Sequence, residues 1–457
     1  MAPESFAGAT REDLIAMVQA LVEENEALRG RVRELERQVR RLSGPPPSAP
    51  SSQRPVWDKP APKPDPKAPG QKKGHAGMTR PRPEQVDKTI EHTECACPEC
   101  GERLVGVERR EQVVEEIIPA HTEAHRHVWL RGHCPRCRAV RDLRPPEVRK
   151  GAYLGTATLL LAAWMKTHLG LPFRKTGEVF EALAGLRVSP GGLSQSVKSL
   201  AKDFAAEIEA IEKALRAEPS VNADETGLRV EGKAQWLWAF TSRRLARFRA
   251  ETTRAGRVVT ETLGESFSGV LGCDFYSAYN RIGCEKQRCL AHLLREIKSV
   301  LDRRGPARPP PAFLLAAKAW CLDALVLGQT WDNYATSTAA EYRRRLERRL
   351  DGLLAMRTRD KDARRLHRRM TRHAGELTTF LWWHGVEGTN NRAERAIRPA
   401  VITRKISGGH RSPTGAQAIA ALTSVLRTCA LQGRDFVQTG LEILRRRHLE
   451  ISQPVLA

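Results

Sequence analysis

The order of strand and helix patterns after Pro219 constrains the fold of this chain more than any other feature of its sequence. Alternating or apolar runs predict three strands, a helix and a fourth strand, at residues 220–226 leading into 228–230, 234–241, 245–250, 254–265 and 269–273. The chain has 457 residues, which is long enough for two or three domains with separate cores. We therefore expect a multidomain α/β protein, with this mixed sheet at the centre of its largest domain.

Two aspartates stand where this order of elements would bring them together. Three antiparallel strands, a helix and a further strand are the order of a ribonuclease H-like core. In that core an acid on the first strand, here Asp224, can lie beside an acid that closes the fourth, here Asp274. Cleavage of a phosphodiester needs an activated water or hydroxyl and a stabilised leaving oxygen. Two Mg²⁺ ions about 3.5–4 Å apart, held by carboxylates, provide both.

The chain resembles the DDE transposases of the insertion sequence 66 family in four strings: NADETGLRV, GCDFYSAYN, CLAHLLREI and GTNNRAERAIRPAVITRKISGGHRS. Two cysteine pairs, a leucine-rich N-terminus and the string GRDFVQTGLEIL resemble that family too, so the likeness covers nearly the whole chain apart from a proline-rich segment. In the family, two aspartates and the glutamate of an N-N-x-x-E-R helix bind the metals, which implies Asp224, Asp274 and Glu394 here. One departure is Thr389, which stands where an aspartate often precedes the two asparagines; that aspartate is not one of the three acids.

The resemblance implies a catalytic transposase that uses two Mg²⁺ or Mn²⁺ ions. Such an enzyme frees a 3′-hydroxyl at the end of its element and joins it to target DNA, by a cut-and-paste or a replicative route. The resemblance also suggests small companion proteins from the same element. One alternative is a non-catalytic DNA-binding regulator derived from a transposase, which would have no reason to keep the three acids. A metal-dependent nuclease without strand transfer would use the same acids.

Each acid also has an ordinary structural interpretation. Asp224 could be a turn residue, and its neighbour Glu225 is the nearest rival for the role of metal ligand. Asp274 could cap the helix that follows its strand. Glu394 lies three residues after Asn391, which is the spacing of a capping box at a helix N-terminus.

A heptad repeat near the N-terminus predicts a coiled coil over residues 1–43. Five leucines follow one another at intervals of seven: Leu14, Leu21, Leu28, Leu35 and Leu42. Valines and one asparagine, Asn25, occupy most of the positions three residues before them, a pattern that favours a two-stranded parallel coiled coil. We therefore expect a homodimer or a higher oligomer. The proline-rich residues 44–74 form a linker after it.

Two C-P-x-C loops predict a zinc ribbon over residues 75–148. The four thiolates that would complete a tetrahedral site are Cys97, Cys100, Cys134 and Cys137. Cys95, His92 and His133 lie close enough to be alternative ligands. We expect hairpin strands at residues 113–118 and 125–130. Four cysteines leave no open coordination position, so the zinc would be structural.

Three helical patterns between residues 149 and 207 predict a module that resembles a helix-turn-helix. Ser189 is a natural N-cap, with Pro190 at the first helical position. Any compact helical hairpin would give the same pattern, so its role in DNA binding is a weak prediction. The catalytic domain would span residues 208–430, with a helical insertion at about 295–385, and residues 431–457 would form a helical tail.

The charge of the chain favours a nucleic-acid partner. Lys and Arg number 76 against 53 Asp and Glu, and the formal net charge is +23. Basic side chains gather around the predicted site and are candidates for phosphate contacts with DNA: Arg392, Arg395, Arg398, Arg404, Lys405, His292 and Arg295.

The sequence predicts a cytoplasmic bacterial protein that associates with the nucleoid when it binds DNA. No uninterrupted apolar run reaches the roughly 18–20 residues of a membrane span, and the strongest candidate is Leu159–Trp164. The acidic and basic residues near Met1 do not form a signal peptide. Ten cysteines in a reducing compartment indicate metal ligands or buried thiols, not disulfides.

Overall fold

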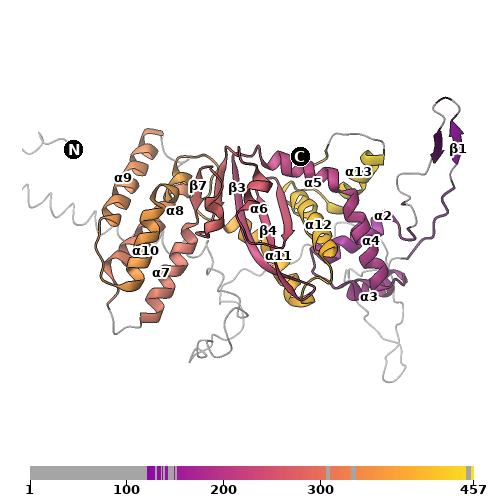
Figure 1. Cartoon of the computed structure of the whole chain (residues 1–457), viewed down its shortest axis with the longest axis horizontal. Helices are drawn as coiled ribbons and strands as arrows, with labels where there is room; N and C mark the ends of the chain where they lie inside the picture. Colours follow the sequence, from indigo (N-terminus) through magenta and orange to yellow (C-terminus); the bar gives the residue numbers. More distant parts are fainter. Residues whose placement is uncertain are drawn as a thin grey trace, which may run out of the picture. The chain divides into compact units, whose positions relative to one another are not determined.

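Figure 1 shows a computed structural model of the chain. The structure describes residues 121–128, 131–134, 136, 139–142, 149, 152–304, 309–330, 336–448 and 454–456. The chain divides into two units, Met1–Glu115 and Glu116–Ala457, and every described residue belongs to the second. The predicted coiled coil, the proline-rich linker, and the zinc ligands Cys97, Cys100 and Cys137 lie outside the described residues and stay predictions.

A five-stranded mixed sheet forms the centre of the second unit, in the order β5-β4-β3-β6-β7. Its strands are β3 (Ser220–Val230), β4 (Lys233–Thr241), β5 (Ala246–Glu251), β6 (Val270–Cys273) and β7 (Lys286–Arg288). The first three pair antiparallel, whereas β6 runs parallel to β3 and β7 parallel to β6. Helix α6 (Arg257–Leu263) connects β5 to β6. The predicted order of three strands, a helix and a fourth strand is confirmed.

Helices cover both faces of this sheet (Figure 1): α5 (Ala205–Leu215) and α6 on one side, and α11 (Asn391–Ser407) and α12 (Pro413–Leu431) on the other. Successive side chains of a strand point to opposite faces. Leu228 of β3 therefore packs with Ile397 of α11, whereas Ala223 packs in the core that contains Val258 of α6. The two faces of β3 thus meet different helices, which decides where each of its acids lies.

The free edge of β5 is covered by hydroxyl groups of α12. The Ala246 N–H donates to Thr428 Oγ1 at 3.1 Å, and the Phe248 N–H donates to Ser424 Oγ at 2.8 Å. Side chains of a helix thus replace the strand partner that an edge strand lacks. This attachment holds α12, and the end of α11 before it, against the sheet.

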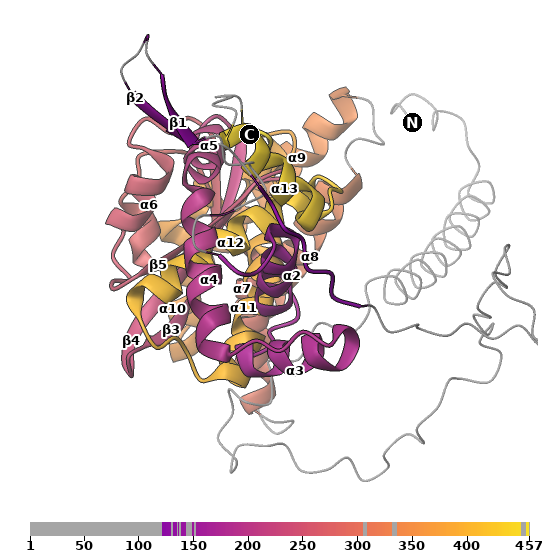
Figure 2. The same ribbon diagram turned by 90° about the vertical axis from the view of Figure 1, so that its right-hand side faces the viewer.

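The three helices predicted before the sheet are confirmed as α2 (Thr156–Thr167), α3 (Phe173–Ala184) and α4 (Pro190–Asp203). Ser189 caps α4 as expected, since its Oγ accepts a hydrogen bond from the Gly192 N–H at 3.1 Å. Gly185 ends α3 with a φ of 66°, a left-handed conformation that favours glycine. Figure 2 shows these helices in front of α12. Helix α13 (Phe436–His448) lies in the predicted helical tail.

The segment between Asp274 and Glu394 contains the predicted helical insertion. After the 3₁₀ turn η4 (Ser277–Asn280), it consists of α7 (Leu290–Arg304), α8 (Ala312–Thr330), α9 (Thr336–Leu354), α10 (Lys361–Arg372), η6 (Ala374–Leu377) and η7 (Thr379–Leu381). These helices share a core of their own around the buried Trp320, whose Nε1 donates to the Leu346 carbonyl oxygen at 2.9 Å.

Among the described helices, α8 alone is long and apolar enough to cross a membrane, with a mean hydropathy of 1.4. The sequence-based choice of Leu159–Trp164 as the strongest apolar segment overlooked it, because Lys318 and Asp323 interrupt the run. Phe313 and Trp320 on α8 are buried in the core of the insertion. Helix α8 is therefore the central helix of this bundle.

A two-stranded hairpin surrounds the second cysteine pair. Strands β1 (Arg131–Cys134) and β2 (Ala139–Asp142) pair antiparallel, with Cys134 opposite Ala139. The prediction of a strand at residues 125–130 is wrong, since residues 125–128 form no strand. The strands instead flank the C-P-x-C loop, since Cys134 ends β1 and Ala139 begins β2.

Candidate active site

Asp224 lies in the middle of β3, on the face of the sheet that α11 covers. It pairs with Ala239 of β4, and it has the same parity along the strand as Leu228, which contacts Ile397 of α11. Its side chain is partly buried. The strand thus presents this carboxylate toward the helix that carries Glu394.

Asp274 follows the last residue of β6. The parallel pairing of β3 with β6 sets Asn222 opposite Gly272, and Asp224 and Asp274 each come two residues later on adjacent strands. Asp274 Oδ1 accepts the Tyr276 N–H at 2.8 Å, so one of its oxygens does cap the turn that follows. The other carboxylate oxygen has no hydrogen-bond partner among the described residues.

Glu394 lies in the first turn of α11. Asn390 is the N-cap of this helix, and no side-chain hydrogen bond caps it, so the capping-box interpretation of Glu394 finds no support. Glu394 Oε1 instead accepts a hydrogen bond from Arg295 Nη2 at 2.5 Å. His292 Nδ1 lies 3.7 Å from the same oxygen. Arg295 and His292, from α7, therefore orient this carboxylate.

The three acids are close enough to change one another's ionisation. Burial first, and then the negative charges of Glu225, Glu394 and Asp274, raise the pKa of Asp224 to about 8. In this position the charged form of the carboxylate is unfavourable unless a cation lies nearby. The three carboxylates come from three separate elements and supply the hard oxygen atoms that a divalent metal prefers. Among the described residues, their oxygens do not form a group that lies within 4.8 Å of one another, so a bound cation would have to draw them together.

Glu225, the rival of Asp224, has its own partners on the opposite face of the sheet. Its carboxylate accepts hydrogen bonds from Tyr279 Oη and from Arg254, whose Nε lies 2.9 Å away. The Arg254 guanidinium in turn lies 3.8 Å from the ring centroid of Tyr276. Because its oxygens are buried and already bound, Glu225 serves to hold β3 against the loop after β6.

Two buried asparagines connect the strand of Asp224 with the helix of Glu394. Asn222 Nδ2 donates to Asn390 Oδ1 at 3.1 Å, and Asn390 Nδ2 donates to the Ala223 carbonyl oxygen at 2.7 Å. A Cβ atom at Gly272 would lie 2.4 Å from Asn222 Nδ2, so glycine leaves room for this pair. The pair fixes the start of α11 on β3, and with it the place of Glu394.

Sequence analysis missed the role of these asparagines. Both stand beside the acids, inside the strings NADETGLRV and GTNNRAERAIRPAVITRKISGGHRS that carry the family resemblance. The signal that could have found them is that a buried asparagine needs a partner for its amide. The residues are 168 positions apart, so no local pattern pairs them.

Glu394 also belongs to a group of three side chains of the types that bind metal ions. One potential ligand atom from each of Cys289, His292 and Glu394 lies within 4.8 Å of the others. Burial raises the pKa of Cys289 to about 11, and its sulfur accepts the Asn390 N–H at 3.1 Å. Burial, and then the charge of Arg295, lower the pKa of His292, so its imidazole is neutral near pH 7. These residues line the side of the site formed by α7.

The basic residues predicted to contact DNA divide into three groups, of which the first, His292 and Arg295, lies at Glu394. Arg392 donates to Glu387 at 2.5 Å and to the Ser242 carbonyl oxygen at 3.2 Å, and Arg404 donates to Thr226 Oγ1 at 3.2 Å and to the Gly227 carbonyl oxygen. These two hold α11 to the sheet. Three others are exposed on α11: Arg395, Arg398 and Lys405.

Known proteins are similar to this chain over most of its length. A family model described as "Transposase IS66 family" matches residues 151–418. Two similar proteins of Sinorhizobium fredii are named "Uncharacterized protein y4qI", 25% identical over 410 residues that cover 81% of this chain and 73% of the relative, and "Uncharacterized protein y4jD", 24% identical over 396 residues that cover 79% and 76%. The family match covers more than half of the chain and includes all three acids. The resemblance found in the sequence is thereby confirmed, and the chain belongs to the IS66 family of transposases.

Proposed function

We propose that this protein cleaves DNA at the ends of its insertion sequence and joins the freed 3′-hydroxyl to target DNA. Family membership implies DNA binding and the use of divalent metal. The finer proposal is carried by the matching positions of Asp224 and Asp274 after the paired residues of β3 and β6, together with the Asn222–Asn390 hydrogen bond that holds the helix of Glu394 on β3. A mixed sheet with β3 at its centre supports a ribonuclease H-like core.

Asp224, Asp274 and Glu394 would hold two Mg²⁺ or Mn²⁺ ions. When bound, such ions activate the attacking water or hydroxyl and stabilise the leaving oxygen of the phosphodiester. The protein's own contribution is to fix the three carboxylates. Arg295 orients Glu394, the Asn222–Asn390 pair holds α11 on β3, and the Tyr276 N–H leaves one oxygen of Asp274 for a ligand.

The remaining parts of the protein would bring DNA and partners to this site. We propose a structural zinc at Cys97, Cys100, Cys134 and Cys137, a coiled-coil dimer through residues 1–43, and a DNA-binding module over residues 149–207. The hairpin of β1 and β2 around the second cysteine pair supports the zinc ribbon. The net charge of +23 supports an extensive contact with DNA phosphates. We place this contact in the cytoplasm of a bacterium.

The test is a strand-transfer assay with DNA that carries the sequences flanking the native gene. Asp274→Asn and Glu394→Gln keep the size of each side chain but remove the charge that a hard cation needs, so both should lose cleavage and strand transfer. Glu225→Gln is the matched control and should keep most of the activity, because Glu225 faces the other side of the sheet. Near-normal strand transfer by Glu394→Gln would overturn the assignment.

Two alternatives give different results in the same assay. A non-catalytic regulator would bind the end DNA without cleaving it in any metal. A nuclease would cleave the DNA but would form no joined product. The retained set of three converging acids favours the transposase over the regulator.

A further inference from the structure

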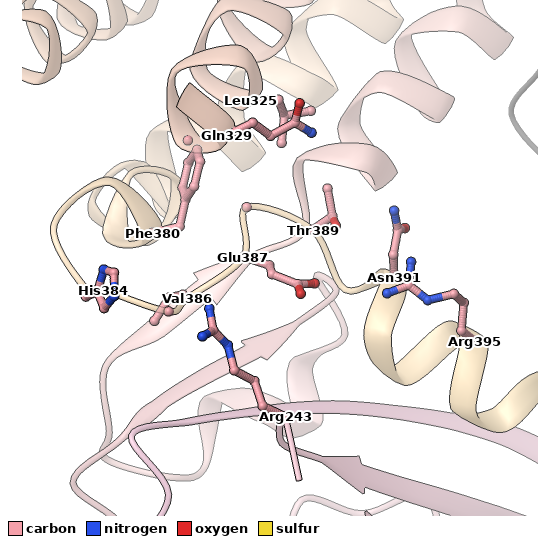
Figure 3. Close-up of a pocket in the computed structure, with 13 residues that line it drawn as sticks. Arg243, Leu325, Gln329, Phe380, His384, Val386, Glu387, Thr389, Asn391 and Arg395 are labelled. Carbon is pink, nitrogen blue, oxygen red and sulfur yellow. The ribbon is translucent and has the colours of Figure 1, made fainter. Parts of the chain in front are cut away.

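A cavity of about 370 Å³ lies beside the proposed active site (Figure 3), within the range of sites that bind small organic groups, about 300–1,000 Å³. Its walls come from three parts of the chain: the turn between β4 and β5, helix α8, and the segment from η7 to the start of α11. The side chains that matter below are Arg243, Leu325, Gln329, Phe380, Asn391 and Arg395. No role has so far been given to this cavity.

Two arginines give the cavity a positive charge. Arg243 and Arg395 line it, and neither forms an ion pair or a hydrogen bond with any described residue. The carboxylate on its wall, Glu387, is already bound by Arg392 at 2.5 Å. Unpaired guanidinium groups at the entrance of a cavity attract an anion, and phosphate is the anion that their planar forks match.

The cavity is lined mainly by polar groups, with a small apolar part at Leu325 and the buried Phe380. Phe380 lies between two glycines, since a Cβ atom at Gly328 would come within 2.3 Å of its ring and a Cβ atom at Gly388 within 2.8 Å. Leu325 continues this apolar part on α8, as Figure 3 shows. The amides of Gln329 and Asn391 stand at its edge. Two arginines and two amides around a small apolar surface suit a planar, heterocyclic ring that carries hydrogen-bonding groups and a phosphate.

The cavity lies close to Glu394, because two of its lining residues belong to the same helix. Asn391 and Arg395 belong to the first turns of α11, on either side of Glu394. A DNA strand whose phosphate lies at the three acids would therefore pass the entrance of the cavity. A base that remains paired inside a duplex could not enter a space of this size, but a base turned out of the helix could.

We propose that this cavity binds one unpaired nucleotide of the substrate DNA next to the cleaved bond. Arg243 and Arg395 hold its phosphate, and the base lies against the wall formed by Leu325 and Phe380, with Gln329 and Asn391 at its edge. The proposal rests on the proposed function, since it needs DNA at the three acids. It adds that the protein distorts the DNA end before or during cleavage.

The probe is a set of duplexes with the element's terminal sequence, in which the fluorescent base 2-aminopurine replaces one base at a time around the cleavage site. Ca²⁺ replaces Mg²⁺, so that the DNA binds with little chemistry. A 2-aminopurine that leaves the stack becomes brighter. Wild-type full-length protein at saturation should brighten one position, or two adjacent positions, and leave the others unchanged.

Arg243→Gln should remove this signal, because the phosphate loses a partner at the entrance. Arg244→Gln is the matched control: it removes the same charge from the same exposed turn, but Arg244 does not line the cavity. Both changes should weaken overall binding by a similar factor, since each removes one cation. Gln329→Phe is an independent second variant, which fills the cavity from an exposed position on α8 and should remove the signal as well.

Cleavage of the same duplexes in Mg²⁺ is measured in parallel to separate the two proposals. Cleavage by the wild type without any bright position overturns the cavity's role and leaves the proposed function standing. A bright position that persists in both Arg243→Gln and Gln329→Phe overturns it too. Weaker binding by Arg243→Gln than by Arg244→Gln, with no bright position in the wild type, would mean that the cavity takes a phosphate alone. Absence of cleavage by the wild type overturns the proposed function and the cavity's role with it.

Discussion

Replacement of Asp224 by asparagine should make the metal-free protein more stable, and the gain should grow with pH. The carboxylate is partly buried beside Glu225, Glu394 and Asp274, and its pKa rises from 3.8 to about 8. The folded state therefore keeps this proton over a range in which the unfolded chain has lost it. The contribution of Asp224 to the free energy of unfolding falls as the pH rises from about 4 to about 8, and asparagine has no such contribution.

The size of the effect follows from that shift. Each pH unit in this range changes the free energy of unfolding by about 1.4 kcal/mol for one proton. Between about pH 5.5 and about pH 8, the advantage of Asp224→Asn over the wild type should therefore grow by about 3 kcal/mol. Urea unfolding in EDTA, followed by tryptophan fluorescence at several pH values, measures this difference, and Trp236 and Trp238 lie on the strand next to Asp224.

Divalent metal should reverse the order of stability. Mn²⁺ binds the ionised carboxylates of the folded wild type and stabilises it by mass action, whereas the variant lacks one ligand. Glu225→Gln should show part of the same trend, because burial raises the pKa of Glu225 and the charge of Glu225 raises the pKa of Asp224. A stability difference that does not change with pH would refute the reasoning, because it would mean that Asp224 is ionised at low pH without cost.

Three further predictions concern other parts of the protein. Asn390→Ala should lower the free energy of unfolding by about 1–3 kcal/mol, because the Ala223 carbonyl loses its side-chain donor and the Asn222 amide keeps only the longer bond to the Thr389 carbonyl oxygen; adding Asn222→Ala should cost little more, and additive losses in urea unfolding would contradict the pairing. Purified protein should contain one zinc per chain by elemental analysis, and Cys134→Ser should lose it while strand cleavage in Mg²⁺ persists at a reduced level; full zinc content in this variant would exclude Cys134 as a ligand. A peptide of residues 1–48 should sediment as a helical dimer, and a monomeric coil at high micromolar concentration would end the coiled-coil prediction.

The sequence predicted the central sheet because its signal is local. Alternation in β3 and β4, the short turn at Gly232 and the apolar run of β6 each depend on neighbouring residues. The order of these elements then placed Asp224 and Asp274 on adjacent strands. Strand β7 was not predicted, since three residues are too few to show a period.

The parts that the sequence did not predict depend on long-range contacts. The Asn222–Asn390 pair, the attachment of Arg404 to Gly227, and the cavity near Arg243 each join segments more than a hundred residues apart. The charges of Arg392 and Arg404 suggested DNA contacts, but the structure gives these side chains internal partners. Composition cannot distinguish an arginine that binds DNA from one that binds its own protein.

The central claim is that three carboxylates hold the metal at which DNA is cleaved. Its most direct test is a crystal structure of the full chain with end DNA and Mn²⁺, in which anomalous scattering locates the ions. We expect two Mn²⁺ ions about 3.5–4 Å apart, bound by Asp224, Asp274 and Glu394. Mn²⁺ at Cys289 and His292 without Asp224, or at Glu225, would contradict it.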